Sequence, residues 1–222
     1  MAVGTRLVQE AGFGLVRVLE AHRLSRGPSL LPVEPPHEHL TSVVRLPAEL
    51  ASVLVEAVEA LPDAGSHYVY PATDVHLTVL DLEGHRARPA ERVRAASRVL
   101  GSTRSFPVVL RGFGVSRHSV YARAYDPTGD LRRLRERLAR EADVRLPLPL
   151  RLLGFVNLLR FRHADVRQLA SAAARLRLEP AAFRAASVEL AWTDKLLSAS
   201  GTELVRQVTL SNPGRRPGTD GG

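Results

Sequence analysis

Apolar and polar positions alternate in several short runs of the chain, and this period of two predicts β-strands. In the clearest run, Tyr68–Leu82, His76 and Thr78 share one face of a strand, while Leu77 and Val79 point to the opposite face as core candidates. Similar runs predict six further strands: His39–Leu46, Phe106–Phe113, Ser119–Tyr125, Leu152–Phe161, Ala186–Asp194 and Glu203–Leu210.

Apolar positions spaced by three or four residues predict helices between these strands. Pro47 opens one that runs through Leu61, and the segment Asp126–Asp130 caps a strongly charged helix over Leu131–Ala142. The other predicted helices are Gly4–His22, Pro89–Leu100 and Asp165–Leu176. Because strands and helices follow each other without a regular alternation, the order favours the α+β class with antiparallel sheets over a doubly wound sheet.

Each half of the chain contains strands and one or two helices, which predicts two related lobes. We therefore expect a bilobal fold in which two mainly antiparallel sheets face a central groove, with the helices on the outside. Residues 1–36 are predicted to form an N-terminal helix and a proline-rich connection, residues 37–210 the bilobal domain, and residues 211–222 a disordered tail.

The composition limits the class of partner. The net charge is +8, and Lys195 is the only lysine, so nearly all basic residues are arginines. The planar guanidinium suits phosphate, which favours a nucleotide or nucleic-acid partner, although a genome-wide codon bias would also enrich arginine. With no cysteine, disulfides and thiolate metal sites are excluded. No apolar run approaches the ~20 residues that cross a bilayer, and no signal peptide is recognisable. A cytoplasmic monomer without a membrane partner is expected.

The strand of His76 carries the most specific chemistry. A titratable ring beside the Thr78 hydroxyl on a rigid strand suits proton transfer at a phosphate. This His-Leu-Thr-Val run follows an approach that contains Tyr and Pro, and a closing pair of strands follows at Val188–Lys195 and Leu204–Leu210. Together these segments resemble the two-histidine phosphoesterases, the 2′,5′ RNA ligase-like and cyclic phosphodiesterase-like proteins, over roughly Leu40–Leu210.

The resemblance implies two His-x-Thr/Ser strands that face each other across a groove. In that family one histidine acts as base and the other as acid on a cyclic or 2′,5′-linked phosphodiester, the hydroxyls hold the phosphate oxygens, and neither metal nor cofactor is needed. His76 and Thr78 are thus the implied catalytic residues. The implied partner is a nucleotide or RNA with a cyclic or 2′,5′ phosphate.

The second motif is expected within Leu152–Phe161, where Phe155 stands in the place of the histidine and Asn157 in that of the hydroxyl. Phe155 cannot transfer a proton, and we expect it to form a wall of the groove. Asn157 can still hydrogen-bond a phosphate. Tyr70 shares the parity of His76 and is a further candidate for substrate binding, although Pro71 interrupts the strand between them.

The missing histidine leaves several functions open. Alternation predicts that Arg160 faces away from Asn157 and forms an ion pair. Among the other histidines, His163 is roughly 26 Å from Phe155 along an extended strand and cannot replace the missing ring without a bend. His67 and His118 have no support in the sequence, whereas His37 and His39 could border the groove if the first strand lies beside that of His76. Because a positioned acid or base contributes ~10²–10⁴-fold, a hydrolase of reduced activity is expected. The alternatives are an inactive nucleotide- or RNA-binding or interaction module of the same fold, and a basic RNA-binding protein whose affinity depends steeply on salt.

Overall fold

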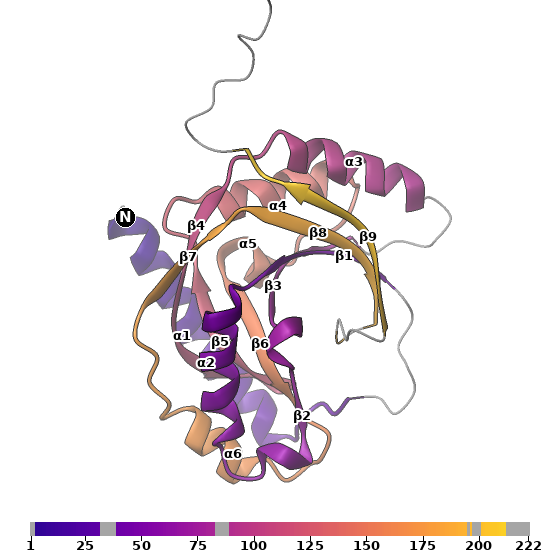
Figure 1. Cartoon of the computed structure of the whole chain (residues 1–222). Coiled ribbons are helices and arrows are strands. Elements are labelled where there is room, and N and C mark those ends of the chain that lie inside the picture. Colours follow the sequence, from indigo (N-terminus) through magenta and orange to yellow (C-terminus); the bar gives the residue numbers. More distant parts are fainter. Residues whose placement is uncertain (1–2, 32–38, 83–88, 195, 197–200, 212–222) are drawn as a thin grey trace, which may run out of the picture.

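The computed structural model describes residues 3–31, 39–82, 89–194, 196 and 201–211 (Figure 1). The end of the proline-rich connection and the tail from residue 212 lie outside the described residues, as does His37. The division of the chain into an N-terminal segment, a domain and a tail therefore stays a prediction.

Within the described residues, nine strands form one antiparallel sheet, strongly curved in Figure 1. The strands are β1 His39–Arg45, β2 Tyr68–Val69, β3 His76–Asp81, β4 Phe106–Val115, β5 Ser119–Tyr125, β6 Gly154–Arg160, β7 Ala181–Ala185, β8 Ser187–Thr193 and β9 Thr202–Thr209. Their order across the sheet is β7-β4-β5-β6-β3-β1-β8-β9, and β2 pairs with β6. All seven predicted strands are present, whereas β2 and β7 were not predicted as separate strands.

The helices pack around this sheet. They are α1 Val3–Ser25, α2 Ala48–Glu59, α3 Pro89–Gly101, α4 Asp130–Glu141, α5 Leu148–Leu152 and α6 Arg167–Ala173, with 3₁₀ turns η1 Ala64–Ser66 and η2 Ala72–Asp74. Helix α4 contacts β3 and α3, α3 also contacts β9, and α6 contacts β4. In the part of the chain that the structure describes, no helix has the length and hydropathy to span a membrane.

The α+β class and the antiparallel pairing are confirmed, but the expectation of two separate sheets is wrong. The two halves join where Leu77 of β3 pairs with Val156 of β6. Both side chains are fully buried, so continuing the sheet through this point keeps a shared apolar core intact. The bilobal arrangement stays a prediction.

Arg135 on α4 holds the strand that carries His76. Only 1% of this residue is exposed. Its guanidinium donates hydrogen bonds to the carbonyls of Thr78 (2.7 Å), Val79 (2.7 Å) and Leu153 (2.8 Å), and also to that of Leu150. Burial lowers the pKa of Arg135 to about 10, so it stays charged at neutral pH. One side chain thus ties α4 to β3 and to the residue that precedes β6.

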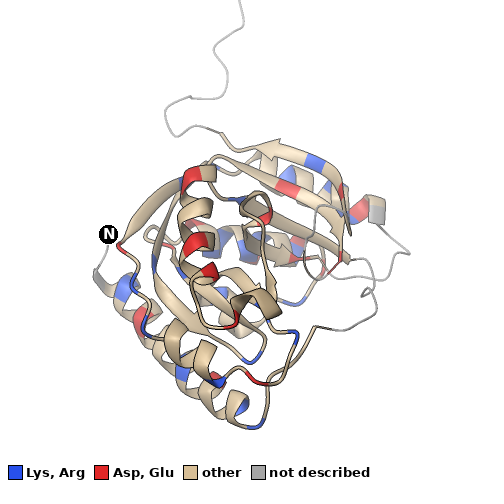
Figure 2. Ribbon diagram, turned by 60° about the horizontal axis from the view of Figure 1, so that its bottom comes forward, with Lys and Arg blue, Asp and Glu red and all other residues tan. Residues whose placement is uncertain are grey.

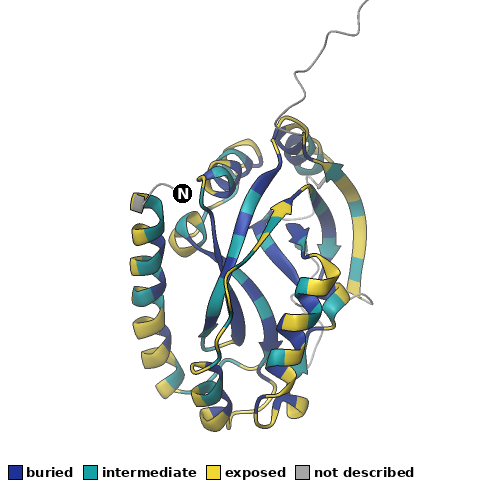
Figure 3. Cartoon of the chain, turned by 60° about the vertical axis from the view of Figure 1, so that its left-hand side comes forward, coloured by how far each residue is buried: buried dark blue, intermediate teal, exposed yellow. Residues whose placement is uncertain are grey.

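Helix α1 packs against the sheet through the side opposite its regularly spaced apolar residues. Its regularly spaced apolar residues, which usually mark the face toward the core, are 47–64% exposed: Leu7, Val8, Leu15, Val18 and Leu19 (Figure 3). The buried side carries Phe13, together with Gln9, which donates to the carbonyl of Leu152 (3.1 Å), and Glu20, which accepts from the backbone N–H of Arg117 (2.8 Å). Specific polar contacts and one aromatic ring therefore hold the helix.

Candidate functional site

His76 lies at the start of β3 and is 3% exposed. Its Nδ1 is 2.7 Å from the carbonyl oxygen of Asp74. A carbonyl oxygen can only accept, so Nδ1 carries the proton of the neutral ring and Nε2 keeps a lone pair. Arg45, which pairs with His76 across the sheet, donates to the same carbonyl (3.1 Å). These contacts fix the ring so that Nε2 can act as a hydrogen-bond acceptor or a base.

The environment keeps this ring uncharged. Burial, together with the nearby charge of Arg45, lowers the pKa of His76 from its ordinary 6.5 to about 4, and the hydrogen bond to the Asp74 carbonyl opposes this shift in part. At neutral pH His76 is therefore in the basic form, ready to accept a proton and poorly suited to donate one.

The same shift predicts a pH-dependent stability. Because the folded pKa lies below the unfolded one, the unfolded chain binds more protons between pH 6.5 and 4, and stability present above pH 6.5 is lost as the pH falls through about 4. A shift of this size corresponds to roughly 3 kcal/mol. Urea denaturation between pH 6.5 and 4 should show that the free energy of unfolding falls less with falling pH for His76→Asn than for the wild type. If the free energy of unfolding falls equally steeply with pH in the two proteins, the lowered pKa of His76 is contradicted.

The sheet places the two predicted motif strands side by side. Since Leu77 is opposite Val156, their neighbours His76, Thr78, Phe155 and Asn157 all project from the other face of the sheet. Antiparallel order then sets His76 near Asn157 and Thr78 near Phe155. Gly154 permits this approach, because a Cβ there would lie 2.8 Å from the Cβ of Ala124 and 3.2 Å from Cδ1 of Leu77. The geometry brings together four of the five predicted site residues.

Thr78 and Asn157 offer hydrogen-bonding groups on this face. Both are partly exposed. In the described part of the chain, no recorded hydrogen bond engages the Thr78 hydroxyl. Oδ1 of Asn157 accepts from the hydroxyl of Ser119 on β5 (3.0 Å), which orients the amide and leaves its NH₂ group to donate. The two side chains can thus donate to oxygens of one ligand.

Phe155 belongs to an aromatic cluster beneath α1. Its ring packs edge-on against Tyr121 (5.1 Å between centroids) and Phe13 (5.8 Å), and Phe13 also contacts Tyr125 (5.1 Å). Glu10 of α1 lies 3.9 Å from Arg123 on the same face of β5. Helix α1 therefore covers this face of the sheet over β4, β5 and the start of β6.

Tyr70, the fifth predicted residue, lies beside His76. The two rings are edge-to-face with centroids 5.9 Å apart, and Tyr70 is 1% exposed. Burial raises the pKa of Tyr70 well above its usual range, while the charge of Arg160 and a side-chain hydrogen bond from it act in the opposite direction. Tyr70 is thus placed to support the imidazole rather than to contact a ligand over a large area.

The predicted direction of Arg160 is wrong. A bulge interrupts the pairing of β5 and β6, so that Tyr121 is opposite Asn157 but Ser119 is opposite Arg160. The extra residue, Leu158, reverses the alternation, and Arg160 projects from the same face as Asn157. Arg160 therefore brings a positive charge to the site and interacts with Tyr70, and the described residues show no ion pair of Arg160 of the kind expected.

The other candidate histidines that the structure describes lie apart from the positions of Phe155 and Asn157. In the described residues, no ring contact or hydrogen bond joins His39, His67, His118 or His163 to Phe155 or Asn157. Nδ1 of His67 accepts from the backbone N–H of Arg162 (3.2 Å), and His39 lies 3.8 Å from Asp81. Likewise, no group of three or more acidic or histidine side chains in the described ranges could hold a metal ion.

Sequence reasoning missed Arg45, Ser119 and Phe13. Arg45 donates to Glu189 (2.9 Å) and lies opposite His76, whereas Ser119 orients Asn157. Only the register between strands that are distant in the sequence reveals these roles. The only sequence feature that pointed to any of these roles was the position of Arg45 near the end of a predicted strand.

Comparisons with known proteins identify the family. A family model described as the 2′-5′ RNA ligase superfamily matches residues 46–196, more than half of the chain. The chain belongs to this superfamily. The matched region of this 2′-5′ RNA ligase superfamily member contains His76 and Asn157 but not α1. No curated protein matches by sequence.

Solved structures of low identity share the fold. TT0787 of Thermus thermophilus is 20% identical, covers 79% of this chain and 99% of its own, and gives a TM-score of 0.57. LigT of E. coli, solved with ATP, is 19% identical, with 81% of this chain and 100% of that chain covered and a TM-score of 0.56. LigT solved with 3′-AMP is 18% identical, with 81% of this chain and 100% of that chain covered and a TM-score of 0.54.

Proposed function

We propose that this protein binds a nucleotide or RNA end through a cyclic or 2′,5′-linked phosphate, and hydrolyses it slowly. The observation that carries the proposal is the register of β3 and β6, which sets His76, Thr78 and Asn157 on one face. Thr78 and the NH₂ group of Asn157 would donate to phosphate oxygens, and Arg160 adds a positive charge. That LigT was solved with ATP and with 3′-AMP supports the ligand class.

In this proposal His76 acts as the base. Its Nε2 lone pair would take a proton from an attacking water, because Nδ1 is engaged by the Asp74 carbonyl. As the water oxygen bonds to phosphorus, the bond from phosphorus to the leaving oxygen breaks, and because Phe155 supplies no acid, the leaving oxygen takes its proton from solvent water. Losing one positioned proton donor costs ~10²–10⁴-fold, so turnover would be slow by that factor relative to a site with two histidines.

A catalytically inactive binding or interaction module is the second candidate. The packing of Phe155 against Phe13 and Tyr121 favours it, because the position of the second histidine then serves to dock α1. Such a module would bind the same ligands without any contribution of His76 to hydrolysis.

Calorimetric titration with 2′,3′-cyclic AMP tests the binding site. The wild type should bind, and Thr78→Val and Asn157→Leu should each bind about 10-fold more weakly, since a hydrogen bond to a charged group contributes about 1.5–3 kcal/mol. Thr5→Val, on α1, is the matched control and should bind like the wild type. Equal affinity of all four proteins would overturn the proposed site, and no binding by the wild type would overturn the ligand class.

A further inference from the structure

Helix α1 presents a continuous apolar stripe to solvent. Of the nine large apolar residues that are exposed in the described part of the chain, five belong to this helix: Leu7, Val8, Leu15, Val18 and Leu19. A sixth, Leu148, lies on α5, which contacts α1. Single exposed apolar residues are ordinary on a protein surface, whereas a contiguous patch of them marks an interaction surface.

The stripe has the spacing of a coiled-coil seam. Positions 4, 8, 11, 15, 18 and 22 follow each other at intervals of four and three residues in turn, and they lie on the side of the helix opposite the buried Phe13 and Glu20. At 1.5 Å per residue the stripe is about 27 Å long. This length and spacing suit a second helix as the partner rather than a small molecule.

No charged residue interrupts the stripe. Its positions from 4 to 18, and the positions 5, 7, 12, 14, 19 and 21 that flank it, contain no Asp, Glu, Lys or Arg. Elsewhere basic and acidic residues are interspersed over the ribbon (Figure 2). A partner can therefore cover this face of α1 without removing a charge from water, which would be costly.

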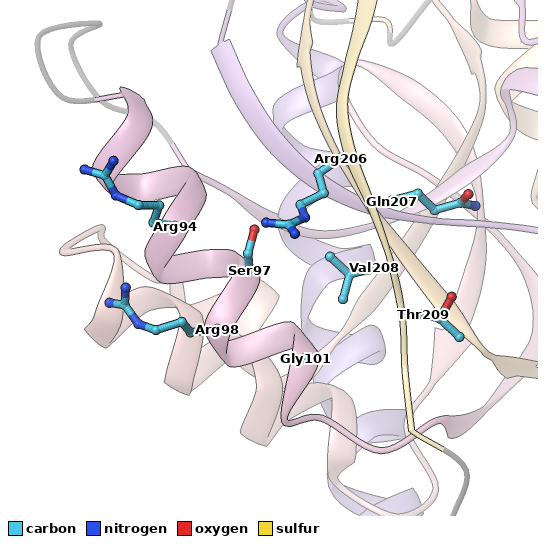
Figure 4. A pocket seen from close by; sticks show the side chains of 8 residues that line it. All are labelled: Arg94, Ser97, Arg98, Gly101, Arg206, Gln207, Val208 and Thr209. Carbon is cyan, nitrogen blue, oxygen red and sulfur yellow. The ribbon is translucent and has the colours of Figure 1, made fainter.

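A cluster of exposed arginines lies away from α1. Arg94, Arg98 and Arg206 line a hollow of about 540 Å³ between α3 and β9 (Figure 4). Helix α3 contacts β9 and α4, whereas α1 contacts α5, β4 and β5. Although the chain has a net charge of +8, two copies that meet through α1 keep these arginines out of the contact.

The stripe is complementary to itself. Three pairs of its apolar residues lie at equal distances on either side of position 13: Leu7 and Leu19, Val8 and Val18, and Ala11 and Leu15. When two copies of α1 lie antiparallel about a two-fold axis at this level, Val8 of one copy faces Val18 of the second copy. The bulky Leu15 likewise faces the small Ala11 of the second copy. A symmetric dimer requires this kind of match of one surface with itself.

Gly14 leaves room for a close partner beside the centre of the stripe. A Cβ at this position would meet no atom within 4 Å, so the packing of the chain itself does not require glycine there. Glycine in the middle of a helix also weakens the helix relative to alanine. A second helix that approaches closely at the two-fold axis gives this glycine a role.

We infer that α1 is a dimerisation helix, through which two copies of this chain associate as an antiparallel, two-fold symmetric helix pair. The helix lies outside residues 46–196, which the family model matches. TT0787 and LigT are covered over 99–100% of their own length but cover only 79–81% of this chain. The interface is therefore separate from the shared fold and from the site of His76.

The dimer is reversible. One helix pair buries less surface than the roughly 1,200 Å² of the smaller stable complexes, so we expect a dissociation constant on the order of 10 μM. The monomer expected from the sequence is then the form at low concentration.

Analytical ultracentrifugation of the full chain between about 1 and 200 μM tests the inference. The wild type should pass from monomer to dimer over this range. Leu15→Glu should raise the dissociation constant at least ~10²-fold, because symmetry places the glutamate in the interface twice. Val53→Glu, on α2, is the matched control: Val53 is 55% exposed and Leu15 62%, and this variant should dimerise like the wild type.

Cysteine cross-linking tests the direction of the pair, since the chain has no cysteine of its own. In the antiparallel pair, position 8 of one copy faces position 18 of the other, whereas the two positions 8 are roughly 15 Å apart along the helices, too far for a disulfide. An equimolar mixture of the single variants Val8→Cys and Val18→Cys should therefore form disulfide-linked dimers on oxidation. Neither variant alone should do so.

Each contrary outcome overturns a stated part of the inference. A wild type that stays monomeric, or an equal loss of dimer in Leu15→Glu and Val53→Glu, overturns the interface. Cross-linking of Val8→Cys with itself overturns the antiparallel pair. If the wild type stays monomeric but sediments with phosphatidylglycerol vesicles, the stripe binds a lipid surface and the dimer is overturned. Circular dichroism confirms that the variants are folded.

Discussion

Replacing Arg135 with methionine is expected to lower the free energy of unfolding by about 3–5 kcal/mol. The guanidinium is almost fully buried and donates to four backbone carbonyls, among them those of Thr78 and Val79. Methionine fills a similar volume but donates no hydrogen bond, so these carbonyls would stay desolvated and without partners. Because two of them belong to β3, the substitution should also loosen the strand that presents His76.

Urea denaturation measures this effect, and Arg137→Met is the matched control. Arg137 is on the same helix, and its guanidinium donates to the exposed hydroxyl of Ser102 (2.7 Å). The control should change the free energy of unfolding by less than about 1 kcal/mol. A loss of similar size in both variants would show that the buried contacts of Arg135 do not hold β3.

Local pattern was enough to predict most of the elements that carry the site. The alternation around His76 and the apolar run that contains Asn157 each predict a strand, and both strands are present as β3 and β6. Both strands could be predicted from the sequence because each has one side in the core, which fixes the period of its apolar residues. The relation to a family of two-histidine phosphoesterases came from the same residues and is confirmed by the match over residues 46–196.

Long-range packing set the features that the pattern did not predict. The bulge at Leu158 reverses the direction of Arg160, and no local sequence signal marks it. The pairing of Leu77 with Val156 joins the strands into one sheet, which depends on contacts across the whole chain. Helix α1 turns its regular apolar face to solvent because Phe13, Gln9 and Glu20 find specific partners on the opposite side.

Restoring the second motif should have the largest effect on activity. The double variant Phe155→His/Asn157→Thr places an imidazole near Thr78 and a hydroxyl near His76, by the register of β3 and β6. A second proton-transfer group should raise the hydrolysis of 2′,3′-cyclic AMP at least ~10²-fold. Because Phe155 packs against Phe13 and Tyr121, some loss of stability is expected as well.

The control for this gain is the single variant Asn157→Thr. It restores the hydroxyl but keeps Phe155, so its rate should stay near that of the wild type. A rate for the double variant no higher than that of this control would mean that the positions of Phe155 and His76 cannot act together on one phosphate.

The central claim is that His76 is the base of a slow phosphodiesterase, and single-turnover hydrolysis of 2′,3′-cyclic AMP by the wild type and by His76→Asn tests it most directly. Titration with the same nucleotide first establishes that both proteins bind. The wild type should hydrolyse the ligand above background, and His76→Asn should be at least ~10²-fold slower. Equal rates in the two proteins, both at background, would contradict the claim and leave the inactive binding module as the function of this fold.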